Sequence, residues 1–351
     1  MQFRSQSNDY LRTMNRMYVL GCILTLFCAC QPSVIKTGFL KFTGSTMGTS
    51  YNVTCGPTQD TTIRKEIDQL LVKINEELST YIPSSTISMF NQENKAVKLS
   101  ATKYFEANLK KSQEIFKASD GYFDPTVMPL VNYWGFGYTE KRPVARIDSP
   151  RVDSLLQFVG FNNLSWEEDL LEKNRSHLQL DFSAIAKGFA VDEIGRYLSQ
   201  RGIENYLVEI GGELVAKGVN QDGKIWNVGI NVPRKDAKLN ELAMAIPLEN
   251  LGMASSGNYR IFYQGDGYDY AHTINPKTGF PEKSDILSAT VLAPTCMMAD
   301  GYATAFMAMG LEKAYTLALN TDDLEVVFLY TNETGELLEK ATPELNKLIK
   351  H

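Results

Sequence analysis

The alternation of apolar and polar residues predicts secondary structure from about residue 39 onward. Alternation typical of a strand runs through residues 39–53 and is interrupted by Gly44-Ser-Thr-Met-Gly48. An amphipathic helix is expected next, because apolar residues recur three and four positions apart while charged residues occupy the other face. These apolar residues are Ile63, Ile67, Leu70, Leu71, Ile74 and Leu78.

A second helix and an irregular aromatic segment follow. The helix is expected over about residues 101–119, with Ser100 as its N-cap and Gly121 just past its end. Residues 121–138 are rich in glycine and aromatic side chains, and Asp124-Pro125 favours a turn. Because exposed aromatic rings need a surface to cover them, we expect an ordered loop in this segment.

The second half of the chain mixes strands and helices without strict alternation. Helices are expected over residues 151–158, 183–200, 296–309 and 311–319. Strands are expected from Leu178 and over about residues 206–210, 225–232, 242–247, 259–263, 268–274, 286–293 and 324–330. Gly211-Gly212 indicates a hairpin turn or a close approach of two backbones. This order predicts an α+β fold and argues against a doubly wound parallel sheet.

Length and charge narrow the class of protein. With 351 residues the chain can form one large domain or two modest ones, each with a sufficient core. The net charge of −6 is spread along the chain without a basic run, so we expect no nucleic-acid partner. Beyond the N-terminus, no apolar segment is long enough to span a bilayer.

The N-terminus has the pattern of a targeting segment. Arg12 and Arg16 precede an apolar run over residues 18–29, which is short for a transmembrane helix. The run ends in Leu26-Phe-Cys-Ala-Cys30, which resembles a bacterial lipoprotein signal with Cys30 as the lipidated residue. Ordinary signal-peptide cleavage, or a start at Met14 or Met17, remains the alternative. We predict a signal peptide over residues 1–30, a tether over 31–36 and the functional domain over 37–351.

Cysteine and histidine are too sparse to favour a zinc site. After processing at Cys30, only Cys55 and Cys296 would remain, either as one disulfide or as two buried small hydrophobes. The histidines are His177, His272 and His351, and no CxxC pair remains.

Two segments place carboxylates at helix starts among small residues. In Met298-Ala-Asp-Gly-Tyr-Ala-Thr304, Asp300 and Thr304 lie four residues apart and therefore on one helix face. Such an oxygen pair suits a hard cation such as Mg²⁺. In the ordinary alternative, the aspartate caps a turn and the threonine bonds back to the carbonyl four residues earlier.

The other segment, Asp181-Phe-Ser-Ala-Ile-Ala-Lys-Gly-Phe-Ala-Val-Asp192, carries Lys187 close to a helix N-terminus. A lysine on a helix is usually solvated, but the small and apolar neighbours of Lys187 favour a phosphate ligand. His272, at the end of an expected strand, is suited to a general base, or else is an edge histidine held by hydrogen bonds. Lys277 in the following turn is expected to be solvated.

Three weaker segments suit backbone contact with a planar ring or a pyrophosphate. They are Thr46-Met-Gly-Thr49, Gly121-Tyr-Phe-Asp124 and Ser255-Ser-Gly-Asn258, and each is also explained by ordinary turn chemistry.

Taken in order, the segments resemble the FAD:protein FMN transferase family (ApbE), including its frequent lipoprotein signal. The matching segments are Thr46-Met-Gly-Thr49, Ser79-Thr-Tyr81, Gly121-Tyr-Phe-Asp-Pro-Thr126, Asp181-Phe-Ser-Ala-Ile-Ala-Lys-Gly188, Gly211-Gly212, His272-Thr-Ile-Asn-Pro-Lys-Thr-Gly279 and Met298-Ala-Asp-Gly-Tyr-Ala-Thr304. The chain departs from the family at Ser183, where glycine is frequent, and at Asn275 and Lys277, where Asp-Pro-Arg is frequent. Neither departure changes a ligand that the resemblance implies.

The resemblance implies an α+β fold of mixed, largely antiparallel sheets packed with helices. It implies an exported, lipid-anchored enzyme on the periplasmic side of a bacterial membrane, which uses Mg²⁺ and takes FAD as substrate. Such an enzyme transfers FMN to a threonine hydroxyl of a partner protein and releases AMP. The expected partners are acceptor flavoprotein subunits of sodium-translocating NADH:quinone reductase or Rnf-type complexes.

The resemblance also assigns roles to residues. Asp300, Thr304 and the main-chain carbonyl of Ala184 would bind Mg²⁺, and His272 would deprotonate the acceptor threonine. The residues expected to line the FAD site are Met47, Tyr81, Tyr122, Phe123, Asp124, Asp181, Lys187 and Ile274. Two other functions stay open from sequence: an FAD pyrophosphatase that yields FMN and AMP, and a flavin-binding lipoprotein without turnover.

Overall fold

The computed structural model describes residues 38–92, 96–139, 148–234, 241–258, 262–265, 268–271, 273–281 and 285–349. The expected signal peptide and tether, including Cys30, lie outside the described residues, and so does His272. In the part of the chain that is described, no helix has the length and apolar character needed to cross a membrane.

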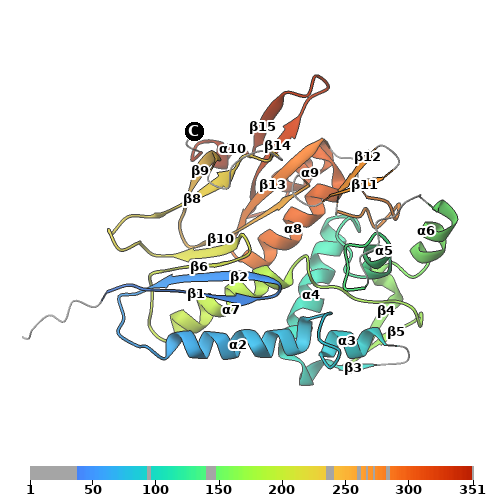
Figure 1. Ribbon diagram of the computed structural model, residues 1–351, viewed down its shortest axis with the longest axis horizontal. Coiled ribbons are helices and arrows are strands. Elements are labelled where there is room, and N and C mark those ends of the chain that lie inside the picture. Colours follow the sequence, from blue (N-terminus) through green and yellow to red (C-terminus); the bar gives the residue numbers. More distant parts are fainter. Residues whose placement is uncertain are drawn as a thin grey trace, which may run out of the picture. The chain divides into compact units, whose positions relative to one another are not determined.

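The central element is an eight-stranded sheet in which every neighbouring pair of strands is antiparallel (Figure 1). Its strands, in spatial order, are β1 (Leu40–Thr46), β2 (Thr49–Cys55), β6 (Tyr206–Ile210), β7 (Glu213–Lys217), β10 (Leu251–Gly257), β13 (Ile286–Ala293), β14 (Glu325–Thr331) and β15 (Leu337–Ala341). Strands that are distant in sequence, such as β2 and β6, are therefore neighbours in space. This topology brings segments from the whole domain to one sheet.

Helices α7 (Ala186–Gln200) and α8 (Cys296–Met309) pack against each other and against the sheet, α7 on β6 and β7 and α8 on β10 and β13. Helix α2 (Ile63–Leu78) packs on α7 and on α4 (Lys103–Ala118), and α4 also contacts α8. Most of the buried apolar side chains of the domain form one core between these helices and the sheet. The amphipathic pattern of residues 63–78 is explained by this burial.

A second core lies against the central strands and involves the hairpin of β8 (Trp226–Asn231) and β9 (Leu242–Leu248). It includes Leu214 from β7, Leu292 from β13 and Leu345 from α10 (Pro343–Asn346). Apolar residues on both sides of β7 explain why Glu213 and Leu214, adjacent in sequence, are both buried.

A third, smaller core joins α5 (Met128–Tyr133) and α6 (Ser149–Leu156) to the turn of residues 273–281. It contains Leu130, Trp134, Val152 and Ile274. The indole Nε1 of Trp134 donates to the carbonyl oxygen of Gly279 at 2.8 Å. The turn that carries Ile274 is thereby anchored to α5.

The remaining elements are short or lie at the periphery. They are α3 (Thr86–Asn91), β3 (Val97–Lys98), η1 (Leu99–Ala101), η2 (Phe161–Asn163), β4 (Leu164–Glu167), β5 (Leu170–Lys173), β11 (Phe262–Gly265), β12 (Tyr268–Ala271) and α9 (Leu311–Leu319).

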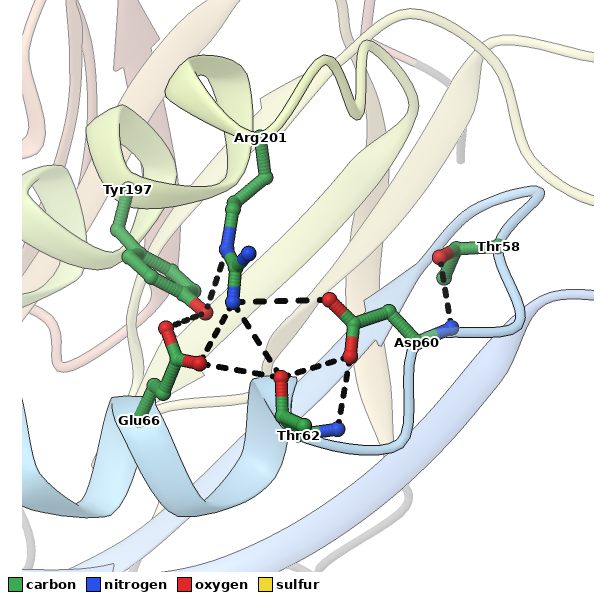
Figure 2. A network of polar contacts seen from close by, with 6 residues as sticks. All are labelled: Thr58, Asp60, Thr62, Glu66, Tyr197 and Arg201. Carbon is green, nitrogen blue, oxygen red and sulfur yellow. Dashed lines mark hydrogen bonds and ion pairs between the residues drawn. The ribbon is translucent and has the colours of Figure 1, made fainter.

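An exposed polar network joins the start of α2 to the end of α7 (Figure 2). Arg201 lies 2.6 Å from the carboxylate of Glu66 and 3.6 Å from that of Asp60. The hydroxyl of Tyr197 donates to the other oxygen of Glu66 at 2.9 Å. The hydroxyl of Thr62 lies within hydrogen-bond distance of both acidic side chains, at 2.7 Å from Asp60 and 3.0 Å from Glu66. The network fastens two helix ends that are far apart in sequence.

The α+β prediction is confirmed, and several elements match their predicted bounds. Helices α8 and α9 and strands β6 and β13 begin and end where the pattern placed them. Gly211 and Gly212 form the turn of the β6–β7 hairpin, in which Ile210 pairs with Glu213.

Some local predictions were wrong. The first hairpin turns at Met47 and Gly48, which both have positive φ, and Gly44 lies within β1. Helix α4 begins after Thr102 and not after Ser100, whose hydroxyl and amide instead donate to Asp169. The cap of α4 comes from another helix, because the Glu77 carboxylate of α2 accepts from the amides of Tyr104 and Phe105 in the first turn of α4.

Other errors concern segments whose composition conceals their structure. The strand expected at Leu178 is only an isolated bridge between Gln179 and Val127, and α7 begins at Ala186, three residues later than expected. Helix α5 lies inside the segment predicted as a loop, and the Ser255–Gly257 part of the predicted loop element is the end of strand β10. By contrast, the expectation that Cys55 and Cys296 are two buried small hydrophobes is confirmed, because both are buried and free.

Candidate active site

Two cavities meet at Ser183 and Lys187, which line both of them. The first has a volume of about 490 Å³ and the second of about 550 Å³. Of the predicted site residues, Met47, Tyr81 and Lys187 line the first cavity. The second is lined by Tyr122, Phe123, Asp124, Asp181, Ala184, Lys187, Ile274, Asp300 and Thr304. The fold therefore gathers all the described members of the predicted site around one bipartite cavity.

Asp300 and Thr304 reach the second cavity from adjacent turns of α8. Helix α8 is capped by Thr295, whose hydroxyl accepts from the amide of Met298 at 3.2 Å. Asp192 of α7 accepts from the two amides that precede Met298, those of Cys296 and Met297, both at 2.8 Å. The start of α8, and hence the position of Asp300, is therefore set by α7.

Gly188 brings the two helices into direct contact at Asp300. Its amide donates to Oδ2 of Asp300 at 3.0 Å. A Cβ atom at position 188 would lie 2.5 Å from the carbonyl oxygen of Cys296 and 2.8 Å from Cβ of Asp300. Only glycine fits there, which gives the Lys187-Gly188 pair a structural reason.

Lys187 forms an ion pair that the sequence did not predict. Its Nζ lies 2.7 Å from Oε1 of Glu213, the first residue of β7 after the Gly211-Gly212 turn. The side chain of Glu213 is only 8% exposed and lines the second cavity. A local signal did exist, because an acidic residue stands directly between a glycine pair and the apolar run Leu214-Val-Ala216.

The pKa values of this cluster follow from burial and mutual charge. Burial raises the pKa of Glu213 to about 7, against the lowering effect of Lys187, and the negative charge of Asp300 adds to the increase. Burial also raises the pKa of Asp300, which Lys187 and the Gly188 amide counteract. For Lys187, burial disfavours the ammonium, but the charges of Asp300 and Glu213 outweigh it and hold its pKa above the ordinary value.

Asp124 and Asp181 organise the loops that form the cavity wall. Oδ1 of Asp124 accepts from the amide and hydroxyl of Thr126 at 2.8 and 2.6 Å, and Oδ2 accepts from the amide of Phe161 at 3.1 Å. Burial outweighs these hydrogen bonds and raises the pKa of Asp124 to about 6. Oδ1 of Asp181 similarly accepts from the amide of Ser183 at 2.9 Å and from its hydroxyl.

Two lysines hold the ring of Tyr122 at the cavity. Nζ of Lys277 lies 4.4 Å from the ring centroid and 2.5 Å from the carboxylate of Asp120. Nζ of Lys313 lies 5.2 Å from the centroid and donates to the tyrosine hydroxyl at 2.8 Å. Lys277 is exposed, as expected for a solvated lysine, but it is also paired, because the turns at residues 120 and 277 meet.

The aromatic and apolar members differ in exposure. Phe123 and Ile274 line the second cavity but are buried, at 2% and 6% exposure. Tyr81 is 69% exposed and meets Tyr138 edge-to-face, with ring centroids 6.4 Å apart.

The donor set near Asp300 suits a hard cation. Among the described residues, no group of three or more histidine, cysteine, aspartate or glutamate side chains is placed to bind a metal. Besides Asp300, the lining of the second cavity includes the Thr304 hydroxyl, which lies 3.5 Å from the Ser256 hydroxyl, and Ala184 with its backbone oxygen. Few protein oxygens, with positions left for water and phosphate, are typical of Mg²⁺ sites that act on nucleotides.

Comparisons with known proteins show which family the chain is similar to. The model of the ApbE family matches residues 47–328. FAD:protein FMN transferases from Vibrio cholerae and Haemophilus influenzae are 36% and 37% identical to the chain. The Vibrio match covers 92% of this chain and 96% of the relative, and the Haemophilus match covers 91% and 93%.

Solved structures give the same result. The structure of the flavin transferase ApbE from Vibrio cholerae has a TM-score of 0.80 and 35% identity, and the match covers 88% of this chain and 99% of that one. The apo structure of the Pseudomonas stutzeri flavinyl transferase ApbE has a TM-score of 0.77 and 30% identity, with coverage of 90% and 98%. The family match, the sequence identities and the fold together establish that this chain belongs to the ApbE family.

Proposed function

We propose that this chain transfers the FMN moiety of FAD to a threonine hydroxyl of an acceptor flavoprotein, with Mg²⁺ as cofactor and AMP as the released product. The observation that carries the proposal is the convergence of Ala184, Lys187, Asp300 and Thr304 on one cavity. Relatives that share about a third of the sequence are FAD:protein FMN transferases, which supports flavin transfer as the reaction class.

The bipartite cavity suits a dinucleotide. FAD has two bulky halves joined by a pyrophosphate, and here two cavities meet at a lysine. Lys187 would bind pyrophosphate oxygens there and offset their negative charge. Tyr81 and Tyr122 offer ring faces or edges to the planar parts of the substrate.

Other residues of the site would bind the cation and transfer the proton. Asp300, Thr304 and the carbonyl of Ala184 would hold Mg²⁺, which supplies charge neutralisation at the phosphates when bound. The acceptor threonine oxygen attacks the FMN phosphorus while the phosphoanhydride bond to AMP breaks, and AMP leaves with the bonding electron pair. His272 would take the threonine proton, and the Gly188 amide holds Asp300 in place through the reaction.

The place of action is part of the proposal. We infer that the protein is exported, lipidated at Cys30 and anchored on the periplasmic side of a bacterial membrane. The proposed acceptors are flavoprotein subunits of sodium-translocating NADH:quinone reductase or Rnf-type complexes. A Cys30→Ala variant should move from the membrane fraction to the soluble fraction, while retention in the membrane would contradict the lipid anchor.

The reaction is tested by mass spectrometry of an acceptor subunit incubated with the purified protein, FAD and Mg²⁺. A mass gain equal to FMN on a threonine, absent with EDTA and absent when that threonine is replaced by valine, is expected. Free FMN and AMP without a labelled acceptor would instead indicate an FAD pyrophosphatase. Unchanged FAD would indicate a flavin-binding protein without turnover.

A further inference from the structure

Glu213 lines the second cavity and has one buried carboxylate oxygen without a hydrogen-bond partner among the described residues. Oε1 is paired with Lys187, but Oε2 has no hydrogen-bond partner among the described residues. The residue is 6% exposed, so water does not freely solvate that oxygen. Burying an unpaired carboxylate oxygen costs free energy. The presence of such an oxygen at Glu213 therefore points to a role in the site.

Lys187 has two possible partners in this cavity. Its positive charge is attracted both to Glu213 and to Asp300, and all three side chains line the same space. Of these two carboxylates, only Glu213 forms an ion pair with Lys187, with 2.7 Å between Nζ and Oε1. Asp300 uses Oδ2 to accept from the Gly188 amide.

If Lys187 closed on Asp300 instead, an ammonium would occupy the position where a cation is to bind. Two positive charges competing for one buried carboxylate repel each other strongly at low dielectric. The ion pair with Glu213 therefore has a consequence for Asp300, because it keeps Lys187 engaged on the β7 side of the cavity.

We propose that Glu213 is a positioning residue that holds Lys187 away from Asp300 and so keeps Asp300 open to a divalent cation. The proposal rests on the proposed function, in which Asp300 is the cation ligand. It assigns to the residue after the Gly-Gly hairpin turn a role in cation affinity, exerted through Lys187.

The test measures binding of Mn²⁺ to the purified full-length protein in the absence of FAD, by electron paramagnetic resonance, with Mg²⁺ as competitor. Glu213→Gln keeps the shape of the side chain and removes its charge, so Lys187 should close on Asp300. We expect Mn²⁺ affinity to fall by at least about tenfold, the range typical of groups that orient metal ligands. The matched control is Glu209→Gln in the same hairpin, whose carboxylate accepts from the Gly212 amide at 2.7 Å and does not line the cavity.

A second variant separates positioning from a simple loss of negative charge. Removing the competing ammonium in the double variant Glu213→Gln/Lys187→Met should restore most of the lost Mn²⁺ affinity, so that the two changes are not additive. Lys187→Met alone should bind Mn²⁺ at least as tightly as the wild type, and this expectation holds even if Glu213→Gln fails to fold.

Three outcomes would overturn the proposal. They are unchanged Mn²⁺ affinity in a folded Glu213→Gln variant, a double variant no better than Glu213→Gln, and weaker binding in Lys187→Met. Failure of the proposed function would look different, because the wild type itself would then bind no Mn²⁺ or would transfer FMN in the presence of EDTA.

Discussion

Helix α7 carries a charged cluster at each end, and the two clusters differ in almost every physical respect. At the C-terminal end, Arg201 joins Asp60 and Glu66 in the exposed network of Figure 2, where each acidic side chain has at least two partners. At the N-terminal end, Lys187 is paired with the buried Glu213 and attracted by the charge of the buried Asp300, and one oxygen of Glu213 has no hydrogen-bond partner in the described part of the chain. Among the residues that the structure describes, each cluster has one cation for two carboxylates, but only in the exposed cluster does every carboxylate have several hydrogen-bonding or ion-pair partners.

The pKa directions express the same contrast. A hydrogen bond from Thr62 lowers the pKa of Asp60, and one from Tyr197 lowers that of Glu66. Burial raises the pKa values of Glu213 and Asp300. A satisfied exposed network stabilises its helix ends modestly, whereas an incompletely neutralised buried cluster is suited to bind a cation.

The largest effect should come from removing the buried carboxylate next to the proposed cation. Asp300→Asn keeps the shape of the side chain but removes its charge, so the cation loses its charged ligand. We expect FMN transfer to fall by about 10³-fold or more, since metal stabilisation of the transition state amounts to several kcal/mol. Transfer of labelled FMN at saturating Mg²⁺ measures this, and near-normal activity would remove Asp300 from the site.

Gly188→Ala should disturb the same cluster through packing. The new methyl group meets the backbone of Cys296 and the side chain of Asp300, so α7 and α8 must separate. We expect a loss of about 1–3 kcal/mol in the free energy of unfolding, together with weaker Mn²⁺ binding. Urea denaturation measures the change in the free energy of unfolding.

Gly195→Ala on the same helix is the control for the preceding change. A Cβ atom there would be 3.1 Å from the hydroxyl of Tyr206 and distant from the cavity residues. It should cost less stability and leave Mn²⁺ binding unchanged. Equal effects of the two substitutions on Mn²⁺ binding would contradict the special role of Gly188.

The two clusters should respond to pH with opposite sign. The lowered pKa values of Asp60 and Glu66 add stability at neutral pH, which is lost as pH falls below their ordinary values near 4. The raised pKa of Glu213, about 7, has the reverse effect: its ionisation in the fold is disfavoured, so stability decreases as pH rises from about 4.5 to 7.

In EDTA, the melting temperature of Glu213→Gln should therefore fall less between pH 5 and 8 than that of the wild type. Arg201→Met should leave this part of the profile unchanged and alter only the acidic part. Scanning calorimetry across the pH range checks both, and parallel profiles of Glu213→Gln and wild type would contradict the assignment.

The smallest effect is expected from the exposed network. Arg201→Met removes both ion pairs of the arginine but keeps the apolar part of the side chain. Because exposed ion pairs contribute little to stability, the free energy of unfolding should fall only slightly. FMN transfer should be unaffected, and a large loss of activity would show that the end of α7 is coupled to the cavity.

Much of the fold was predictable where an element has a regular pattern of its own. Helix α8 and strand β13 begin and end as expected, since each is a run of mostly apolar and small residues between polar turns. Strand β10 was not predicted from the sequence, because Gly252, Ser255 and Ser256 break the pattern of apolar and β-branched residues that is typical of a strand. It forms because it lies centrally in the sheet under α8, where a Cβ atom at position 252 would be 2.1 Å from the amide nitrogen of Cys296.

The sequence by itself determined the family, the flavin-transferase class, and the pairing of Asp300 with Thr304, all of which are carried by residues close together in the chain. The family and class are confirmed, and the ligand roles of the pair stay predictions. Only the tertiary structure decided that Glu213 meets Lys187 and that Gly188 holds Asp300, across 26 and 112 residues of chain. Local patterns report which face of one element is buried, whereas the partner of a buried charge depends on which elements pack together.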